Sequence, residues 1–138
     1  MKILKMLWTL PNTLIGVLLG LLSFAWPWWD GRGALIFESD RGFRKFHARQ
    51  GYAAITFGNA IITTPDHSER LMRHELTHVR QYETWGPFYA LAYGFYWVKL
   101  WLQGQDPYWD NPFEVAARAA EDQPPVAVAA DSEVQPTS

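Results

Sequence analysis

The chain has 138 residues, a formal net charge of −2 and no cysteine, which limits it to one domain with one modest core. A disulfide framework and thiolate metal ligands are excluded, so any metal site must use histidine and carboxylate ligands. Its 12 Lys and Arg residues are scattered along the sequence, and we therefore expect no nucleic-acid partner. Eight Trp, eight Phe and six Tyr are an unusual aromatic load, typical of proteins that contact the lipid–water boundary.

The first predicted element is an apolar segment at residues 1–30. Lys2 and Lys5 precede an apolar stretch from residue 14 to residue 26, and a Trp-Pro-Trp-Trp cluster ends it. A cleavable signal peptide fits the basic start and the small-x-small sequence at 23–25, but the tryptophan cluster favours a retained anchor, tilted or lying in the interface. A buried core helix is the third interpretation. We expect this segment to associate with membrane lipid, and its orientation stays open.

Short β-strands are predicted between residues 32 and 64. The four runs ALIFES, FRKFHA, YAAITF and AIIT are rich in β-forming residues and are separated by glycine-bearing or charged breaks. Gly58 and Asn59, between the last two runs, suit a two-residue hairpin with a positive φ at the glycine. We therefore expect a small antiparallel sheet that ends in this hairpin.

A helix is predicted directly after the sheet. Asp66 and Glu69 form a capping-box pattern, and apolar residues then recur at helical spacing, which predicts a helix over residues 67–84. The following segment, 85–102, has Lys99 as its only charge. It is predicted to be either a buried core helix or a membrane-embedded one.

The last predicted helix begins near Asn111 and Pro112, which suit the N-cap and the first helical position, and extends to about residue 121. After residue 122 the sequence turns to Pro, Ala, Val and Ser without periodicity. Residues 123–138 are therefore predicted to be a disordered tail.

The chemistry of the chain is concentrated in a His-Glu-x-x-His motif in the middle of the predicted helix. Residues four apart lie above one another on a helix, so His74 and His78 can bind one metal ion. Glu75 stands where a general base can take a proton from water activated by that ion. The structural alternative is a surface helix with three solvated polar residues.

Two histidines need a third protein ligand, because a catalytic zinc site has three and keeps one position open. The histidine-containing metzincin pattern is excluded, since Gln81 and Thr84 occupy its later positions. Geometry also disfavours His67, which lies at the start of the same helix. Glu114 is the best candidate, and Glu121 is the second choice. Glu114 can alternatively form a capping box with the N-cap residue.

The string HELTHVRQYE followed by NPFEVAA resembles the gluzincin zinc peptidases, in particular the single-domain minigluzincins and small uncharacterised bacterial membrane proteins with the same motif. Those families pair His-Glu-x-x-His with a downstream Glu-x-x-Ala, which Glu114 and Ala117 match. An Asp usually follows, whereas this chain has Arg118, which removes an acid that would orient a histidine. The resemblance covers residues 66–122 and implies a zinc ion (Zn²⁺), with the sheet edge above the cleft as a binding site for an extended peptide.

These observations predict an α+β fold: a small antiparallel sheet packed on the His-Glu-x-x-His helix, an N-terminal apolar helix and a C-terminal helix carrying the glutamate ligand. The expected division is a membrane segment at 1–30, a zincin-like catalytic domain at 31–122 and the tail. The predicted function is a zinc metallopeptidase, with Glu75 as general base, that cleaves a peptide or protein substrate at a membrane, and the expected location is the bacterial inner membrane. The alternative is a non-catalytic, zinc-stabilised membrane module for protein interaction.

Three further residues are weaker candidates for the catalytic site. Tyr108 and Tyr82 are possible donors to the oxyanion of the reaction, although a structural role is the simpler interpretation for both. Asp110 can orient a zinc-bound imidazole, with a solvated loop carboxylate as the alternative.

Overall fold

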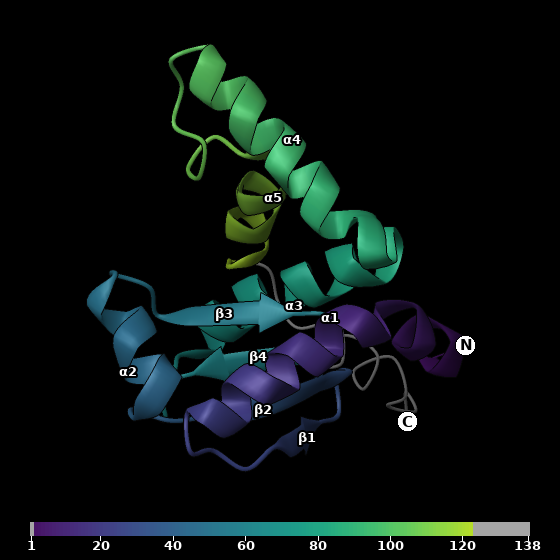
Figure 1. Ribbon diagram of the computed structural model, residues 1–138, viewed down its shortest axis with the longest axis vertical. Coiled ribbons are helices and arrows are strands. Elements are labelled where there is room, and N and C mark those ends of the chain that lie inside the picture. The colour runs from purple at the N-terminus through teal and green to yellow at the C-terminus, as the bar shows by residue number, and fades with distance from the viewer. Residues whose placement is uncertain (1, 123–138) are drawn as a thin grey trace, which may run out of the picture.

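The computed structural model describes residues 2–122, so the predicted tail lies outside the described residues. The chain is α+β, as predicted, with a four-stranded sheet between helix α1 on one face and helix α3 on the other (Figure 1). In chain order the elements are α1 (Lys2–Leu22), β1 (Trp28–Asp30), β2 (Ala34–Glu38), α2 (Gly42–Arg49), β3 (Ala54–Phe57), β4 (Ala60–Thr63), α3 (Glu69–Trp85), the 3₁₀ turn η1 (Gly86–Phe88), α4 (Tyr89–Leu102) and α5 (Pro112–Ala120).

The sheet is mixed, and the prediction of an antiparallel sheet was wrong. Its strand order is β1-β2-β4-β3, with β1–β2 and β3–β4 antiparallel but β2–β4 parallel. The hairpin at Gly58 and Asn59 is confirmed, since Phe57 pairs with Ala60 and Gly58 has a φ of 60°. This hairpin inserts β4 beside β2 and leaves β3 at the edge of the sheet.

The run FRKFHA, predicted as a strand, forms helix α2 instead. The spacing of its aromatic residues fits a strand as well as a helix. Alternate residues share one face of a strand, and residues four apart share one face of a helix. The helix uses this spacing: the rings of Phe43 and His47 stack with centroids 5.8 Å apart, and Arg44 is buried beneath them. Helix α2 also carries the chain from β2 to β3, which allows the parallel pairing of β2 with β4.

Alternate residues of the strands face opposite sides of the sheet and form two separate cores. On one side Ile36 and Ile61 pack against α3 together with Ala34, Met72, Leu76 and Val79. On the other side Phe37, Ala60 and Ile62 pack beneath α1 with Ala25, Val17 and Leu19. The period of two expected for a sheet covered on both faces is therefore present.

Helix α1 lies close to the sheet because its inner face is built from small residues. A Cβ atom added at Gly16 would come within 2.7 Å of the Ala60 Cβ, and one added at Gly20 would come within 2.3 Å of the Phe37 ring. One helix of the described chain, over Ile3–Leu22, is long and apolar enough to cross a membrane, and only 17% of that window is buried.

Helices α3, α4 and α5 form the remaining layer. Helix α3 agrees with the prediction except at its start, where Ser68 rather than Asp66 is the N-cap and its Oγ accepts from the Leu71 amide at 3.0 Å. Helix α5 begins as predicted, with the Asn111 side chain accepting from the Phe113 amide. Tyr82, Tyr89 and Phe113 pack together where the three helices meet.

Candidate metal centre

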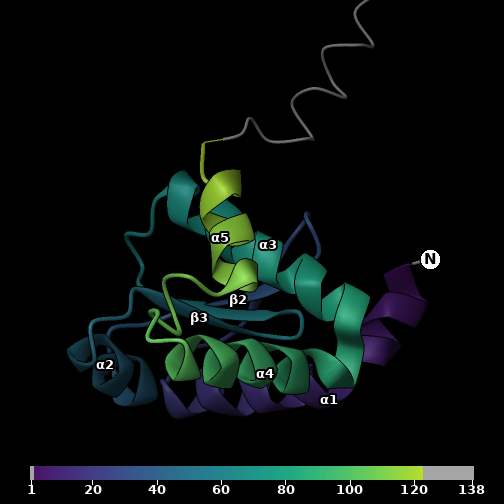
Figure 2. The ribbon, with the colours of Figure 1, turned by 90° about the horizontal axis from the view of Figure 1, so that it is seen from above.

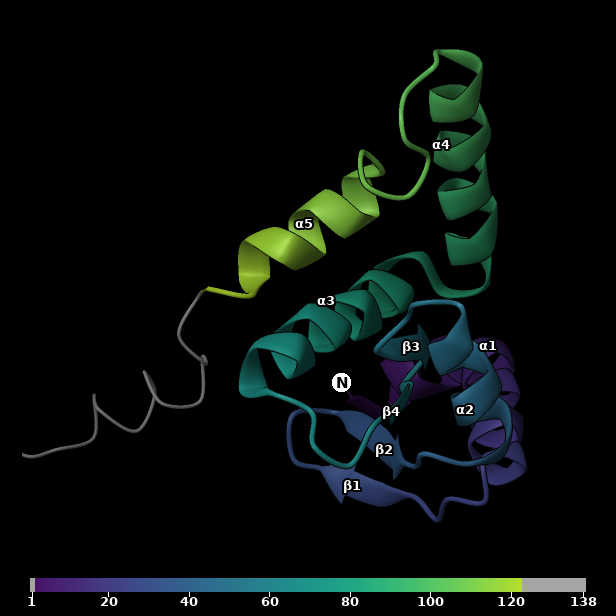
Figure 3. The ribbon, with the colours of Figure 1, turned by 90° about the vertical axis from the view of Figure 1, so that its left-hand side faces the viewer.

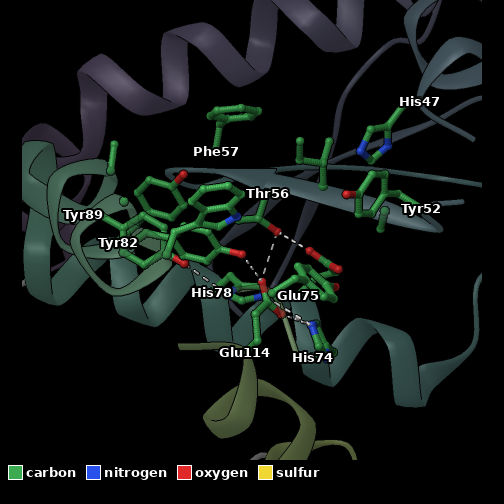
Figure 4. A pocket seen from close by; sticks show the side chains of 17 residues that line it. His47, Tyr52, Thr56, Phe57, His74, Glu75, His78, Tyr82, Tyr89 and Glu114 are labelled. Atoms are coloured by element: carbon green, nitrogen blue, oxygen red, sulfur yellow. Dashed lines mark hydrogen bonds and ion pairs between the residues drawn. The ribbon is translucent and has the colours of Figure 1, made fainter. Parts of the chain in front are cut away.

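Two helices bring the predicted metal ligands together. His74 and His78, one turn apart on α3, point their Nε2 atoms toward each other at 3.2 Å. Glu114 enters from the first turn of α5, and its Oε2 lies 3.2 Å from Nε2 of His74 and 3.3 Å from Nε2 of His78 (Figure 4). All three residues are buried, and they form a group that can hold a metal ion.

The triangle has the dimensions of a tetrahedral site. Bonds of about 2.0–2.1 Å at the tetrahedral angle separate neighbouring ligand atoms by about 3.3 Å. The three observed separations of 3.2, 3.2 and 3.3 Å agree with that value. A tetrahedral ion bound to these three atoms would therefore need little movement of the three side chains.

Hydrogen bonds of the two Nδ1 atoms determine that the Nε2 lone pairs of His74 and His78 point into the triangle of ligand atoms. Nδ1 of His74 donates to Glu121 Oε1 at 2.8 Å, and Nδ1 of His78 donates to Gln81 Oε1 at 2.9 Å. The Gln81 amide is oriented by its own Nε2, which donates to the Phe113 carbonyl at 2.9 Å. In their neutral forms both histidines therefore direct unprotonated Nε2 atoms at each other and at a carboxylate. Three electron-pair donors at this distance need a cation or a proton between them.

Glu121, the second-choice ligand of the sequence analysis, supports His74 from outside the triangle. Its Oε2 accepts from Nε of Arg70 at 3.0 Å, and its backbone carbonyl accepts from Nε of Arg73 at 2.9 Å. The Glu121 carboxylate therefore orients the His74 imidazole. In the gluzincins that this sequence resembles, an Asp usually stands where this chain has Arg118. Arg118 is directed elsewhere, with its guanidinium 3.8 Å over the Trp109 ring.

Each histidine of the group and the carboxylate of Glu114 favour the charged form of the other. Burial lowers the pKa of His74 and of His78, but hydrogen bonds to Glu114 and the charge of Glu75 outweigh it and leave both pKa values raised. Burial raises the pKa of Glu114, yet the hydrogen bonds to both histidines lower it to about 2. Glu114 therefore stays ionised, as a metal ligand must.

Glu75 lies next to the triangle and is held by the sheet. Its Oε2 accepts a hydrogen bond of 2.6 Å from the hydroxyl of Thr56 on the edge strand β3, and only 5% of the residue is exposed. Both residues border a cavity of about 500 Å³ that also contains the three ligands (Figure 4). Thr56 was not foreseen from the sequence, because only the fold brings β3 above α3.

Aromatic side chains form most of the remaining cavity wall. The Tyr93 hydroxyl donates to Glu114 Oε1 at 3.1 Å, and the Tyr89 hydroxyl lies 3.3 Å from Nδ1 of His78. Neither residue was singled out in the sequence. Tyr82 and Tyr108, the candidate oxyanion donors, also line the cavity, and burial raises the pKa of Tyr108 to about 12. The cavity is therefore an aromatic one with a polar floor.

The other candidates lie outside the triangle. Nδ1 of His67 contacts the Thr64 carbonyl at 3.0 Å and Glu38 at 3.4 Å. Asp110 accepts from the backbone amide of Asp106 in the α4–α5 loop. His47 lines the far end of the cavity, where its ring stacks on Tyr52.

Comparisons of the chain with protein-family models, with curated proteins and with solved structures found no match. We therefore infer function from the chemistry of the site.

Proposed function

We propose that this chain is a zinc-dependent peptidase that acts at a membrane, the bacterial inner membrane, with Glu75 as its general base. The observation that carries the proposal is the triangle of His74, His78 and Glu114 beside a buried second glutamate on the wall of a cavity. A purely structural zinc site has four protein ligands and no need of that carboxylate. The resemblance to gluzincins supports the same assignment.

Zinc suits this ligand set better than other common ions. Imidazole and carboxylate ligands also hold non-haem iron, but the separations of 3.2–3.3 Å fit tetrahedral coordination. When bound, zinc supplies a Lewis acid that polarises a carbonyl group and makes water acidic enough to react near neutral pH. Glu75 can then accept a proton from the attacking water and return it to the leaving amine.

Thr56 prepares Glu75 for this role. A hydroxyl that donates to Oε2 leaves Oε1 of the same carboxylate free to receive the proton, and it fixes the side-chain rotamer on the cavity side. Strand β3 has a free edge directly beside Thr56, since it pairs with β4 alone. An extended peptide can add to this edge through main-chain hydrogen bonds and so lie across the cavity.

The test begins with metal content and continues with hydrolysis. Mass spectrometry of the purified chain should find one zinc per molecule, and His78→Ala should lose it. The wild-type chain should cleave peptides from a mixed-sequence library, whereas Glu75→Gln should retain zinc and cleave none. Continued cleavage by Glu75→Gln would show that the base is assigned wrongly.

The same experiment separates the alternative function. A non-catalytic, zinc-stabilised membrane module would contain zinc and lose it in His78→Ala, but the wild-type chain would cleave no member of the library. Iron in place of zinc would show that the metal is assigned wrongly, and hydrolysis by the iron-loaded chain would then decide whether the peptidase assignment stands.

A further inference from the structure

Helix α1 has the reverse of the usual polarity of a surface helix. Its polar residues Thr9, Asn12 and Thr13 are at most 9% exposed and face the protein. Asn12 donates to the Gly86 carbonyl at 3.1 Å, and the Thr13 hydroxyl accepts from the Asn59 amide at 3.0 Å. The opposite face is dominated by large apolar side chains, each 42–60% exposed: Leu4, Leu7, Leu10, Leu14, Ile15, Leu18, Leu21 and Leu22. A soluble protein normally turns such a stripe inward.

A second helix exposes similar side chains on the same side of the molecule. Large apolar residues of α4 that are 49–72% exposed are Leu91, Phe95, Val98, Trp101 and Leu102, and the one charged residue of the helix, Lys99, is exposed beside them. Figures 2 and 3 show α1 and α4 along one side, with α5 on the opposite side. Two segments about 80 residues apart in sequence therefore build one apolar face, which we call the α1–α4 face.

Charged and aromatic groups at the border of this face suit a lipid headgroup region. Helix α2 packs beside the C-terminal end of α1 and presents Lys45 and Arg49 to solvent without an acidic residue between Gly42 and Arg49, whereas Arg41 at its N-cap pairs with Asp40 at 4.0 Å. Phe24 and Trp26, directly after α1, are 79% and 83% exposed. Basic and amphipathic aromatic residues around an apolar surface are typical of binding to anionic membranes.

The packing of α1 also determines its angle to the membrane. The helix contacts the protein along its whole length, from Trp8 against Gly86 to the Leu22 carbonyl against Gly42. If α1 crossed the bilayer in this packing, the sheet beside it would enter the hydrocarbon, together with buried polar groups such as Asp30 and Asn59. If α1 lies parallel to the surface, only its outer face enters the lipid.

We propose that the α1–α4 face lies in the plane of an anionic bilayer, so that the protein is held at one leaflet and does not span it. This deepens the membrane part of the proposed function but does not depend on catalysis. The catalytic cavity adjoins the docking face, because Ala90 and Gly94 of α4 border both the cavity and an apolar groove on the outer side of α4. A substrate segment embedded in the lipid can therefore reach the zinc site without leaving the membrane surface.

The chain has no cysteine, which permits a clean test with single spin labels on the full chain bound to vesicles of phosphatidylethanolamine and phosphatidylglycerol. Labels replace Leu7, Leu14 and Leu21 of α1 and Val98 of α4, and immersion depth is measured by power saturation. All four should lie at similar shallow depth. The control label replaces Val115, which is 48% exposed on α5, the helix that lies away from α1 and α4 in Figures 2 and 3, and this label should stay in water.

Two results would overturn the proposal. A spanning helix would place the labels at residues 7 and 21 at depths about 21 Å apart, from the rise of 1.5 Å per residue. A second copy of the chain on this face would give a dimer that stays in solution, with all labels away from lipid.

Two substitutions give a readout independent of the labels. Leu18→Glu, at a residue 58% exposed, should leave folding intact but abolish flotation with vesicles. Lys45→Gln with Arg49→Gln should weaken binding about fivefold per charge removed on anionic vesicles, and should leave binding to neutral vesicles unchanged. Full flotation of Leu18→Glu would refute the docking face. If the wild-type chain hydrolyses peptides but does not float with vesicles, the docking proposal is refuted and the peptidase proposal stands. If it floats but hydrolyses no peptide, the peptidase proposal is refuted and the docking proposal stands.

Discussion

Removal of the Glu121 carboxylate should weaken metal binding although none of the three proposed metal ligands is replaced. Oε1 of Glu121 is 2.8 Å from Nδ1 of His74, so the carboxylate fixes the tautomer that leaves Nε2 free for metal. Loss of such an outer carboxylate typically lowers metal affinity about 10- to 100-fold. We expect Glu121→Ala to fall within this range. Glu121→Gln, which retains a neutral acceptor but also two N–H donors, should lose about tenfold or less.

The matched control for this experiment is Asp122→Asn, one residue later. Asp122 is exposed and shares the partner Arg70 at 3.6 Å, but it does not contact His74. Zinc affinity is measured by competition with a chromophoric chelator at constant pH and salt. Wild-type affinity in Glu121→Ala, or an equal loss in Asp122→Asn, would show that the carboxylate does not orient the ligand.

Three further predictions concern the base, the protons and the packing of α1. Thr56→Val should slow hydrolysis but leave zinc content unchanged, because the Glu75 carboxylate loses its 2.6 Å hydrogen bond; an equal rate would show that Thr56 has no role. The metal-free chain should lose stability as pH rises through the raised pKa values of His74 and His78, and again as pH falls below the usual carboxyl range toward the Glu114 pKa of about 2; denaturation at several pH values measures both, and a flat profile contradicts them. Gly20→Ala should lower the free energy of unfolding by about 1–3 kcal/mol through overpacking on Phe37. The control Gly94→Ala is also in a helix, but an added Cβ there meets no atom within 4 Å, so it should be neutral or stabilising by up to about 1 kcal/mol. Urea denaturation measures both.

Local spacing was enough to predict the residues that share one helix or one turn. The pair His74 and His78 needs only the helical repeat, and the hairpin at Gly58 needs only the preference of glycine for positive φ. Glu114 was predicted as the third ligand because it begins a second helix whose small residues, Ala116 and Ala117, allow close packing on the first, and because the resemblance to gluzincins matches it. The pattern alone did not show that its carboxylate turns inward to His74 rather than back to the helix N-terminus.

The sequence alone could not predict contacts between elements that are far apart in the chain. Thr56 meets Glu75 only because β3 is the edge strand above α3, and that position follows from the parallel pairing of β2 with β4. A helix at 42–49 makes this pairing possible. The strand predicted there would have continued an antiparallel meander and placed a different strand at the edge.

Helix α1 shows why hydropathy alone could not give its orientation. An apolar stripe on one face predicts that this face is buried, but where α1 crosses Phe37 and Ala60 most closely there is no room for a side chain at Gly16 or Gly20. Leu14 and its apolar neighbours therefore face outward, where none of the described residues buries them. The same close approach that makes Gly20→Ala destabilising thus turns the apolar face toward the proposed lipid surface, and any substitution that separates α1 from the sheet should weaken folding and membrane docking together.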